Sequence, residues 1–342
     1  MQQNAERFEF HGKTGEFFKI WIVNILLSIV TLGIYSAWAK VRSRQYFYSN
    51  TLLMKTPFNY LADPVKILKG RILVLVAFII YTFSAIISPM LQLALLIIFL
   101  PLLPWVIIKA LKFNMYNMAY RNIRFHFSAE YLKALWVFLG LPILVAFSLG
   151  LAYPYFIREQ KKFIINHTSY GRSPFEMEAS IGKFYSIFAK TVALLLLFGL
   201  LVSAFASGLD FLKEMLKEPS AMAGFMMIIL LLFFPLYMMM YGYWYVNITN
   251  LVLSNTTLHQ CQFNSDLKTT KICWLFFSNT LAIILSFGLL IPWAMIRTAD
   301  YRISCLSLIS ENDLGAFIAG EAEHAGAIGE EIGDFMDIDL GL

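Results

Sequence analysis

Long apolar runs alternate along the chain with shorter polar and aromatic stretches. The longest run, residues 72–108, is long enough for two membrane-spanning helices of roughly 20 residues each. Pro89 interrupts it, because proline cannot donate the backbone hydrogen bond of a continuing helix, so 72–88 and 91–108 are predicted to form a tight hairpin. We therefore predict seven hydrophobic segments; the runs without a charged residue are 20–39, 72–108, 134–157, 191–209, 219–247 and 272–296.

The stretches between these runs carry a second pattern. "TLLMKTPF" (51–58), "TSYGRSPF" (168–175) and "TTLHQCQF" (256–263) share Thr and Phe in register, and "NMAYRNIRF" (117–125) keeps a reduced form. They are rich in Tyr, Phe, Thr and Asn with period-two alternation, which is typical of short strands or hairpins. The predicted order is strand, helix, strand and helical hairpin, repeated, and ending in a third strand and helix.

Three of the runs share a frame of glycine and aromatic residues. The glycine is followed five positions later by one ring and thirteen positions later by another; the three sets are Gly33, Trp38 and Tyr46, then Gly150, Tyr155 and Phe163, then Gly288, Trp293 and Tyr301. The position before the first ring is Ala37, Pro154 or Pro292. Self-similarity of this kind indicates internal repeats, and we interpret these residues as structural punctuation of the helices.

Composition restricts the class of protein. The chain of 342 residues is 59% hydrophobic and only 14% charged, with a mean hydropathy of +0.66. A chain this apolar cannot cover its surface with polar groups as a water-soluble globule. It is therefore predicted to be an integral membrane protein whose main partner is the lipid bilayer.

Several stretches resemble a known family. "FEFHG", "EFFKIWIVNILLSIVTLGIYSAWAKVRSRQYFYSNT", "TSYGRSPF" and the closing "DIDLGL" are similar to the YjgN-like family of bacterial inner-membrane proteins. The resemblance extends over nearly the whole chain, although the Thr is missing in 117–125 and Glu159 stands where a basic residue is usual. It implies a multi-pass protein of the bacterial inner membrane and, since the family is of uncharacterised function, no activity.

Together these patterns predict an all-α polytopic membrane protein with internal repeats, in which short β-strands or hairpins lie at the membrane surface between helices. The predicted units are an N-terminal strand segment 1–19, a first repeat 20–116, a second repeat 117–250, a partial third repeat 251–310 and an acidic tail 311–342. Within them we expect single helices at 20–39, 134–157 and 272–296, strand regions at 45–60 and 163–177, and helical hairpins at 72–88/91–108 and 191–209/219–247.

Charge suggests how the chain sits in the membrane. Loop 40–71 carries seven basic residues against one acidic residue, so the positive-inside rule predicts that it is cytoplasmic. If all seven segments cross, the remaining Lys and Arg divide only weakly between the two sides. If helices 20–39, 134–157 and 272–296 enter and return on one face, almost all basic residues lie inside. Charge favours this second arrangement, and helix length favours the first.

Candidate chemistry is sparse. No nucleophile–base pair, phosphate-binding glycine loop or paired carboxylate is apparent, so we predict no catalytic residue, no cofactor site and no enzyme. The histidines lack metal-ligand spacing, so no metal is predicted either, and short membrane-adjacent basic loops do not indicate nucleic acid. Lys40, Arg42 and Arg44 are candidate contacts for anionic lipid headgroups. Nothing in the sequence indicates an oligomeric state.

Two functions remain open from the sequence. Repeated broken helices are typical of transporters, which favours transport or handling of a lipid or apolar solute. The alternative is a non-catalytic structural or assembly protein of the cell envelope. A cavity beside Gly33, Gly150 and Gly288 would favour the first, and a solid core there the second. The tail from Glu311 has nine acidic residues and no Lys or Arg; it is either solvated or docked onto the basic loop 40–71.

Overall fold

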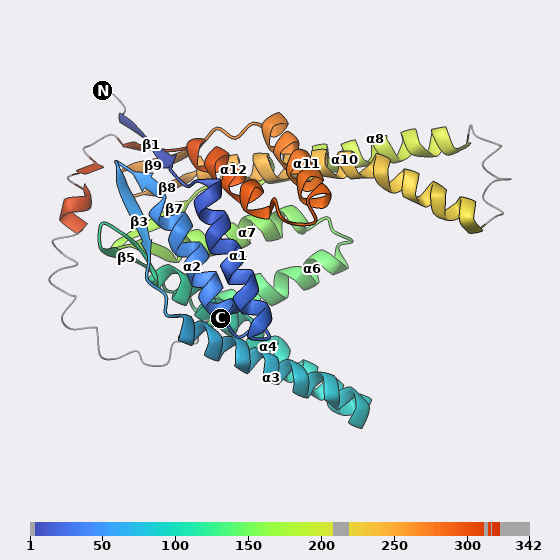
Figure 1. Cartoon of the computed structure of the whole chain (residues 1–342), viewed down its shortest axis with the longest axis horizontal. Helices are drawn as coiled ribbons and strands as arrows, with labels where there is room; N and C mark the ends of the chain where they lie inside the picture. The colour runs from blue at the N-terminus through green and yellow to red at the C-terminus, as the bar shows by residue number, and fades with distance from the viewer. Residues whose placement is uncertain (1–3, 208–218, 311–313, 316, 322–342) are drawn as a thin grey trace.

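A computed structural model describes residues 4–207, 219–310, 314–315 and 317–321. In this part of the chain, ten short strands form a closed antiparallel barrel from which helical hairpins extend (Figure 1). The strands are β1 Asn4–Phe10, β2 Thr51–Leu53, β3 Thr56–Tyr60, β4 Met118–Tyr120, β5 Ile123–Phe127, β6 Thr168–Tyr170, β7 Ser173–Met177, β8 Thr256–Leu258, β9 Cys261–Ser265 and β10 Leu306–Ser310.

The barrel has an up-and-down topology, because each strand pairs with its neighbours in sequence. Strand β1 closes it by pairing with both β2 and β10, with Phe8 opposite Leu53 and Glu6 opposite Leu308. Strands as short as three residues are viable in such an arrangement because closure leaves no unpaired strand edge.

Tight turns join the strands at one rim of the barrel. In the turns between β2 and β3 and between β4 and β5, both central residues have positive φ: Met54 and Lys55 at 50° and 60°, and Arg121 and Asn122 at 48° and 65°. Positive φ at both positions is the geometry of a type I′ turn, whose twist matches that of antiparallel strands. These turns correspond to the hairpins predicted at 51–58 and 117–125.

The described helices between strands leave from the opposite rim, because each lies between the end of one strand and the start of the next antiparallel strand. Five excursions result: α1 Thr14–Val30 with α2 Ser36–Ser49; α3 Pro64–Ile87 with α4 Pro89–Tyr116; α5 Tyr131–Leu135, the π-helix η1 Trp136–Gly140 and α6 Leu141–Phe147 with α7 Tyr153–Asn166; α8 Ile181–Ser207 with α10 Pro219–Leu253; and α11 Thr269–Leu285 with α12 Ile291–Ser304. Among the described residues, α3, α4 and the part 181–200 of α8 are long and apolar enough to cross a membrane.

Side chains at the helix ends direct the chain back into the barrel. The amides of Asn50, Asn117 and Asn255 each donate to the carbonyl oxygen four residues earlier, at 2.7–2.8 Å. Thr168 and Thr256 are the first residues of β6 and β8, and their hydroxyls also donate to the carbonyl oxygen four residues earlier. These bonds satisfy carbonyls that a helix end otherwise leaves unpaired. They explain why Asn and Thr stand at the junctions between helix and strand.

The expected all-α fold is wrong, because the strands form a closed barrel rather than isolated surface hairpins. For the helices expected at 20–39, 134–157 and 272–296, the sequence leaves open whether they span the membrane or return on one face. Each is divided by a turn, at 31–35, 148–152 and 286–290, into two helices. The reversal is direct in the first case, since the Asn24 amide of α1 reaches toward the Ala39 carbonyl of α2. By contrast, α3 and α4 meet at Ser88, where the sequence predicts a break.

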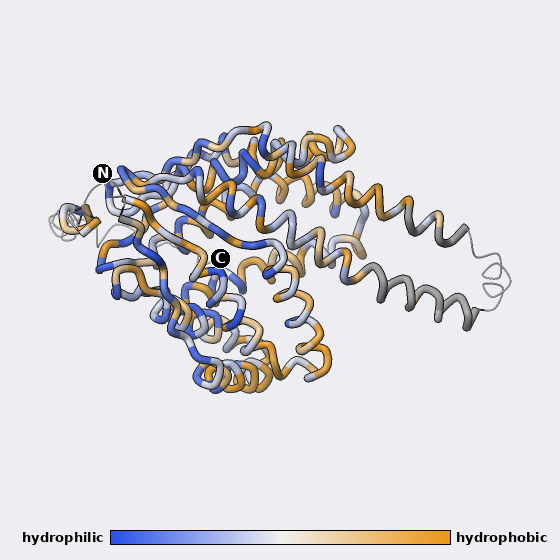
Figure 2. The backbone as a smooth tube through the Cα atoms, turned by 90° about the horizontal axis from the view of Figure 1, so that it is seen from above, coloured by the Kyte–Doolittle hydropathy of each residue, from blue (hydrophilic) through white to orange (hydrophobic). Residues whose placement is uncertain are grey.

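Hydrophobic residues are distributed differently in the two parts of the molecule. The hydropathy colouring is mixed along the barrel and strongly apolar along the far parts of the helical hairpins (Figure 2). At the tips of the three short hairpins, Leu32, Leu149 and Phe287 are 95%, 94% and 98% exposed. Apolar tips of this kind are compatible with lipid and costly in water.

Candidate functional site

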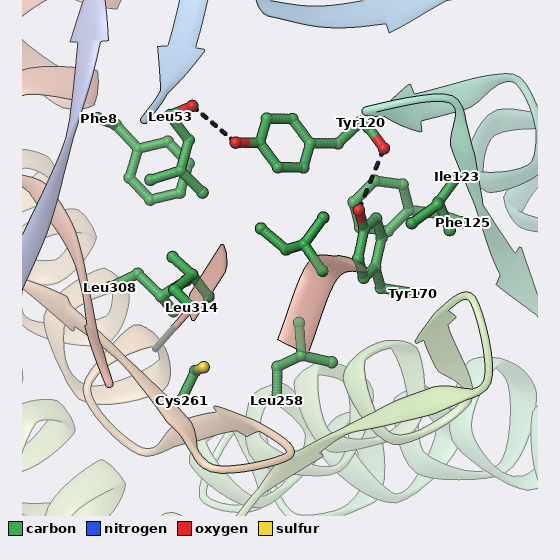
Figure 3. Close-up of a cluster of buried hydrophobic side chains, with 11 residues drawn as sticks. Phe8, Leu53, Tyr120, Ile123, Phe125, Tyr170, Leu258, Cys261, Leu308 and Leu314 are labelled. Atoms are coloured by element: carbon green, nitrogen blue, oxygen red, sulfur yellow. Dashed lines mark hydrogen bonds between the residues drawn. The ribbon is translucent and has the colours of Figure 1, made fainter. Parts of the chain in front are cut away.

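The barrel encloses an apolar cavity of about 240 Å³. Inward-facing side chains from strands on all sides line it (Figure 3). The alternation of strand residues explains the lining, since every second side chain of a strand points to the same face. The aromatic residues of the lining include Phe8, Phe58, Tyr120, Phe125, Tyr170 and Phe175.

Aromatic rings form a continuous row around this lumen. Phe58 packs on Tyr120 with ring centroids 4.6 Å apart, and Phe125 packs on Tyr170 at 5.1 Å. The row continues from Phe125 to Phe175 at 6.1 Å with the rings stacked. Offset and tilted ring pairs are favourable beyond the area that they bury, so the rings hold one another around the space that they enclose.

The tyrosine hydroxyls do not make this lumen polar. The hydroxyl of Tyr120 donates to the Leu53 carbonyl at 2.6 Å, and that of Tyr170 donates to the Tyr120 carbonyl at 3.1 Å (Figure 3). Burial, and to a lesser extent the neighbouring Tyr120, raises the pKa of Tyr170 well above its usual value. Both rings therefore present carbon to the cavity while their hydroxyls are satisfied by the strand backbone.

A second apolar cavity of about 220 Å³ adjoins the lumen at the helical rim. The two share the lining side chains Met118, Phe125, Phe175 and Phe263. The second is completed by residues of three helices, Met115 of α4, Ile164 and Ile165 of α7 and Leu253 of α10. Apolar lining thus extends from the barrel interior to helices that lead away from the barrel.

Residues 314–315 and 317–321 cover the lumen at the tight-turn rim. Leu314 and Ile318 are buried in the same cluster as the lumen residues, and Phe317 stacks on His259 at 5.3 Å. Glu321 fastens this segment, because its carboxylate accepts hydrogen bonds from the Arg172 backbone N–H and the Ser173 hydroxyl, each at 2.8 Å. We call residues 314–315 and 317–321 the plug segment.

Docking of the acidic tail onto the basic loop 40–71 stays a prediction. The carboxylate of Glu321 is bonded to the β6–β7 turn, and Leu314 and Ile318 belong to the apolar cluster that also contains Leu53 of loop 40–71. The rest of the predicted tail, 311–313, 316 and 322–342, lies outside the described residues.

The predicted glycine frame lies away from this cavity. Gly33, Gly150 and Gly288 have φ of 91°, 89° and 89° at the hairpin tips, each preceded by a residue that also has positive φ. The N–H of each glycine donates to the carbonyl five residues earlier, at 2.7–2.8 Å, which is a Schellman-type helix ending. A side-chain atom added at Gly33 or Gly150 would meet nothing within 4 Å, so neither of these two glycines lies in a solid core.

The residues around the first ring of the frame are structural. Ala37, Pro154 and Pro292 are fully buried, and the two prolines lie in the first turns of α7 and α12, where a missing N–H costs nothing. The rings lie nearer the surface: Trp38 stacks on Tyr35, Arg297 lies 5.0 Å over Trp293, and Tyr155 is half-buried.

The basic residues Lys40, Arg42 and Arg44 of α2 have different surroundings. Arg44 points inward, donating to the Tyr60 hydroxyl at 2.8 Å and to the Asn114 amide oxygen at 2.5 Å. Arg42 is exposed, and Lys40 is half-buried in a groove between α1 and α2. Of the three candidates for headgroup contact, Arg44 is thus occupied by protein groups.

Comparison with known proteins places the chain. The family described as "Bacterial protein of unknown function (DUF898)" matches residues 5–335, which is nearly the entire chain. The chain belongs to this family. The DUF898 match covers nearly the whole barrel and the five described helical excursions.

Relatives of this DUF898 protein give its location. It is 34% identical over 144 residues to the inner membrane protein YjgN of Salmonella typhimurium, covering 41% of this chain and 36% of the relative. It is 31% identical over 156 residues to inner membrane protein YjgN of Escherichia coli K12, covering 44% of this chain and 38% of the relative. The matched regions thus span little more than a third of these relatives. No solved structure matches the chain.

The predicted resemblance and the predicted location in the bacterial inner membrane are confirmed by these relatives. Sequence reasoning missed the lumen and the plug segment. For the turns at the hairpin tips, a signal was present in the sequence, namely a hydroxyl residue two positions before each glycine. The hydroxyls of Thr31, Ser148 and Ser286 accept a hydrogen bond from the backbone N–H four residues later, at 2.9–3.0 Å. A hydroxyl residue, an apolar residue and glycine in sequence would have indicated a turn instead of a continuing helix.

Proposed function

We propose that the protein handles membrane lipid by accommodating a hydrocarbon chain in the barrel lumen. The observation that supports this is the apolar lumen of about 240 Å³, adjoined by the cavity of about 220 Å³ toward α4, α7 and α10. Apolar cavities exclude water and accept apolar guests, and ligand sites are concave and mostly apolar. The second cavity offers the chain a route of entry from the helical rim.

The proposed orientation places the helical hairpins in the inner membrane and the barrel, with loop 40–71, on the cytoplasmic side. The protein is then multi-pass through its long helices, while the shorter hairpins insert their tips at Leu32, Leu149 and Phe287 without crossing. Two features support this: the short hairpins return to the rim from which they leave, and basic residues are retained on the cytoplasmic side of membranes.

Photocrosslinking tests the lumen. The full-length protein is reconstituted with a phospholipid that carries a diazirine at the end of one acyl chain, and the adducts are mapped by peptide mass spectrometry. We expect adducts on strand residues such as Met118 or Phe175, in addition to the exposed helix faces that any bilayer would label. Adducts confined to helices would contradict lipid handling and favour the structural or assembly role.

A matched pair of variants sharpens this test. Leu258→Trp fills the lumen, so strand adducts should fall at least about fivefold while helix adducts persist. Leu281→Trp, at an exposed position of α11, adds the same ring outside the barrel and should leave the strand adducts unchanged. Equal strand labelling in both variants would show that the chain does not enter the lumen.

Orientation is tested separately with Lys55→Cys, at the exposed β2–β3 turn, in a variant with Cys261, Cys273 and Cys305 replaced by serine or alanine. A membrane-impermeant maleimide should label it only after the inner membrane of spheroplasts is permeabilised. Labelling of intact spheroplasts would contradict the cytoplasmic barrel.

A further inference from the structure

A groove of about 510 Å³ lies between α1 and α2, away from the barrel lumen. Asn24 lines it and is only 5% exposed. Its amide nitrogen approaches the Ala39 carbonyl at 3.5 Å, but no described group donates a hydrogen bond to its oxygen Oδ1. A buried acceptor without a donor costs free energy, so its retention at this place calls for an explanation.

The third hairpin shows how the same position is satisfied within the protein. Asn24 and Asn279 both lie nine residues before the turn glycine, and their amides point to the carbonyls of Ala39 and Ala294. Around Asn279, however, Thr298 accepts from Nδ2 at 2.9 Å and Arg297 donates to Oδ1 at 3.2 Å. The first hairpin thus keeps the amide but lacks the internal donor.

Positive charge gathers at the groove. Lys40 lines it, and Arg71 of α3 donates to the hydroxyl of Ser36, another lining residue. Burial, and then the nearby guanidinium groups of Arg44 and Arg71, lower the pKa of Lys40. Among the described residues, no carboxylate forms an ion pair with any of these three cations. A positive cluster without a protein counter-charge is suited to an anion.

The lining also suggests where that anion lies in the membrane. Trp21 lines the groove, and tryptophan is enriched at the level of lipid headgroups. Below it, the hairpin continues to the exposed apolar tip at Leu32. The hydroxyls of Ser28, Ser36 and Ser43 add further polar groups to the same groove. The groove therefore carries polar groups along its length, and the exposed apolar tip at Leu32 lies beyond it.

We propose that this groove binds the headgroup of an inner-membrane phospholipid whose phosphodiester is followed by a hydrogen-bond donor. Lys40 pairs with the phosphate, and Asn24 Oδ1 accepts from the hydroxyl or ammonium group of the headgroup. Phosphatidylglycerol and phosphatidylethanolamine have such a donor, and phosphatidylcholine has none. The site is separate from the barrel lumen and does not depend on the function proposed for it.

Native mass spectrometry of the full-length protein with each of these three lipids tests the site. The wild type should retain phosphatidylglycerol and phosphatidylethanolamine at least about fivefold better than phosphatidylcholine. Lys40→Gln should lower retention of the first two about fivefold, the size expected for one cation near a headgroup. Lys69→Gln, an exposed position of α3, removes the same charge outside the groove and should have no effect.

Asn24→Leu provides a second variant, which should fold normally. Leu141 already occupies the corresponding position of the second hairpin and is fully buried. Because the variant removes the acceptor without a donor, its melting temperature without lipid should rise, while its preference for donor-bearing lipids over phosphatidylcholine should disappear. A wild-type preference in Asn24→Leu, or equal losses in Lys40→Gln and Lys69→Gln, would overturn the proposal.

Inorganic phosphate distinguishes a lipid from a free anion. Millimolar phosphate without lipid should shift the melting temperature of the wild type no more than it shifts that of Lys40→Gln. Phosphatidylglycerol should shift that of the wild type more. If phosphate alone gives the full Lys40-dependent shift, the groove is a site for a soluble anion and the lipid assignment is wrong.

Discussion

The barrel lumen and the tips of the short hairpins use the same residue types in opposite ways. Phe125 is buried among other rings inside the barrel, whereas Phe287 is almost completely exposed at the turn between α11 and α12. Both belong to apolar, aromatic stretches of the sequence. The barrel hides its rings from every solvent, and the hairpin tips are stable only if lipid covers them.

This difference shows that one chain can be built for two solvents. The barrel closes on itself, so its inward-facing apolar side chains are shielded from water within the barrel. The hairpins satisfy their backbone within helices, which leaves their side chains free to face hydrocarbon. Substitutions of matched residues in the two regions should therefore have opposite sensitivities in detergent and in membranes.

The largest effect is expected from removing a ring. Phe125→Ala should lower the free energy of unfolding by about 3–5 kcal/mol, since a buried ring leaves a cavity that its neighbours cannot fill. Phe287→Ala should change it by no more than about 0.5 kcal/mol. Denaturant titration in mild detergent measures both, and equal losses would show that the tip is packed against protein.

A charge at the tip should reverse this ranking in membranes. Phe287→Lys should cost about 2.5–3.5 kcal/mol if the tip lies deep in the hydrocarbon, so less protein remains in alkali-washed inner membranes. In detergent, its unfolding should match that of the wild type. Asn59→Lys, on the exposed outer face of β3, is the control. If Asn59→Lys is lost from membranes as much as Phe287→Lys, the placement of the tip in hydrocarbon and of the barrel outside it is contradicted.

The turn geometry can be separated from helix propensity with two glycines. Gly33→Ala should destabilise the protein by about 1–2 kcal/mol, because φ of 91° is unfavourable for a residue with a side chain. Gly199→Ala, inside α8 with open space around it, should stabilise it by up to about 1 kcal/mol. Thermal unfolding in detergent measures both, and the same sign for both changes would exclude this explanation of the turn.

The smallest effect is expected at a lumen hydroxyl. Tyr170→Phe loses the bond to the Tyr120 carbonyl and should cost about 1 kcal/mol at neutral pH. Since burial raises the Tyr170 pKa above the usual value of 10.0, the unfolded chain releases the proton first, and wild-type stability should fall as pH rises above 10. The variant should show a shallower fall in an alkaline unfolding series; an identical slope would show that another group titrates.

Much of the local structure was predictable because its causes are local. Period-two alternation in 51–58, 168–175 and 256–263 indicated hairpins, and the barrel has β2–β3, β6–β7 and β8–β9 there. Pro89 indicated the break that the structure has at Ser88. The reversal at Gly33 was not resolved from sequence, because an apolar tip that faces lipid has the same hydropathy as the middle of a spanning helix.

The sequence by itself determined that this chain belongs in a membrane, where its short strands begin and which side chains alternate along them, because these depend on composition and near neighbours. Only the tertiary structure decided that the strands close into a barrel, that its lumen is apolar and that the plug segment covers one rim. Closure depends on β1 pairing with both β2 and β10, and Glu321 bonding to Ser173 joins residues 148 positions apart. No local pattern specifies such partners, so the cavity that they enclose appears only when the chain is folded.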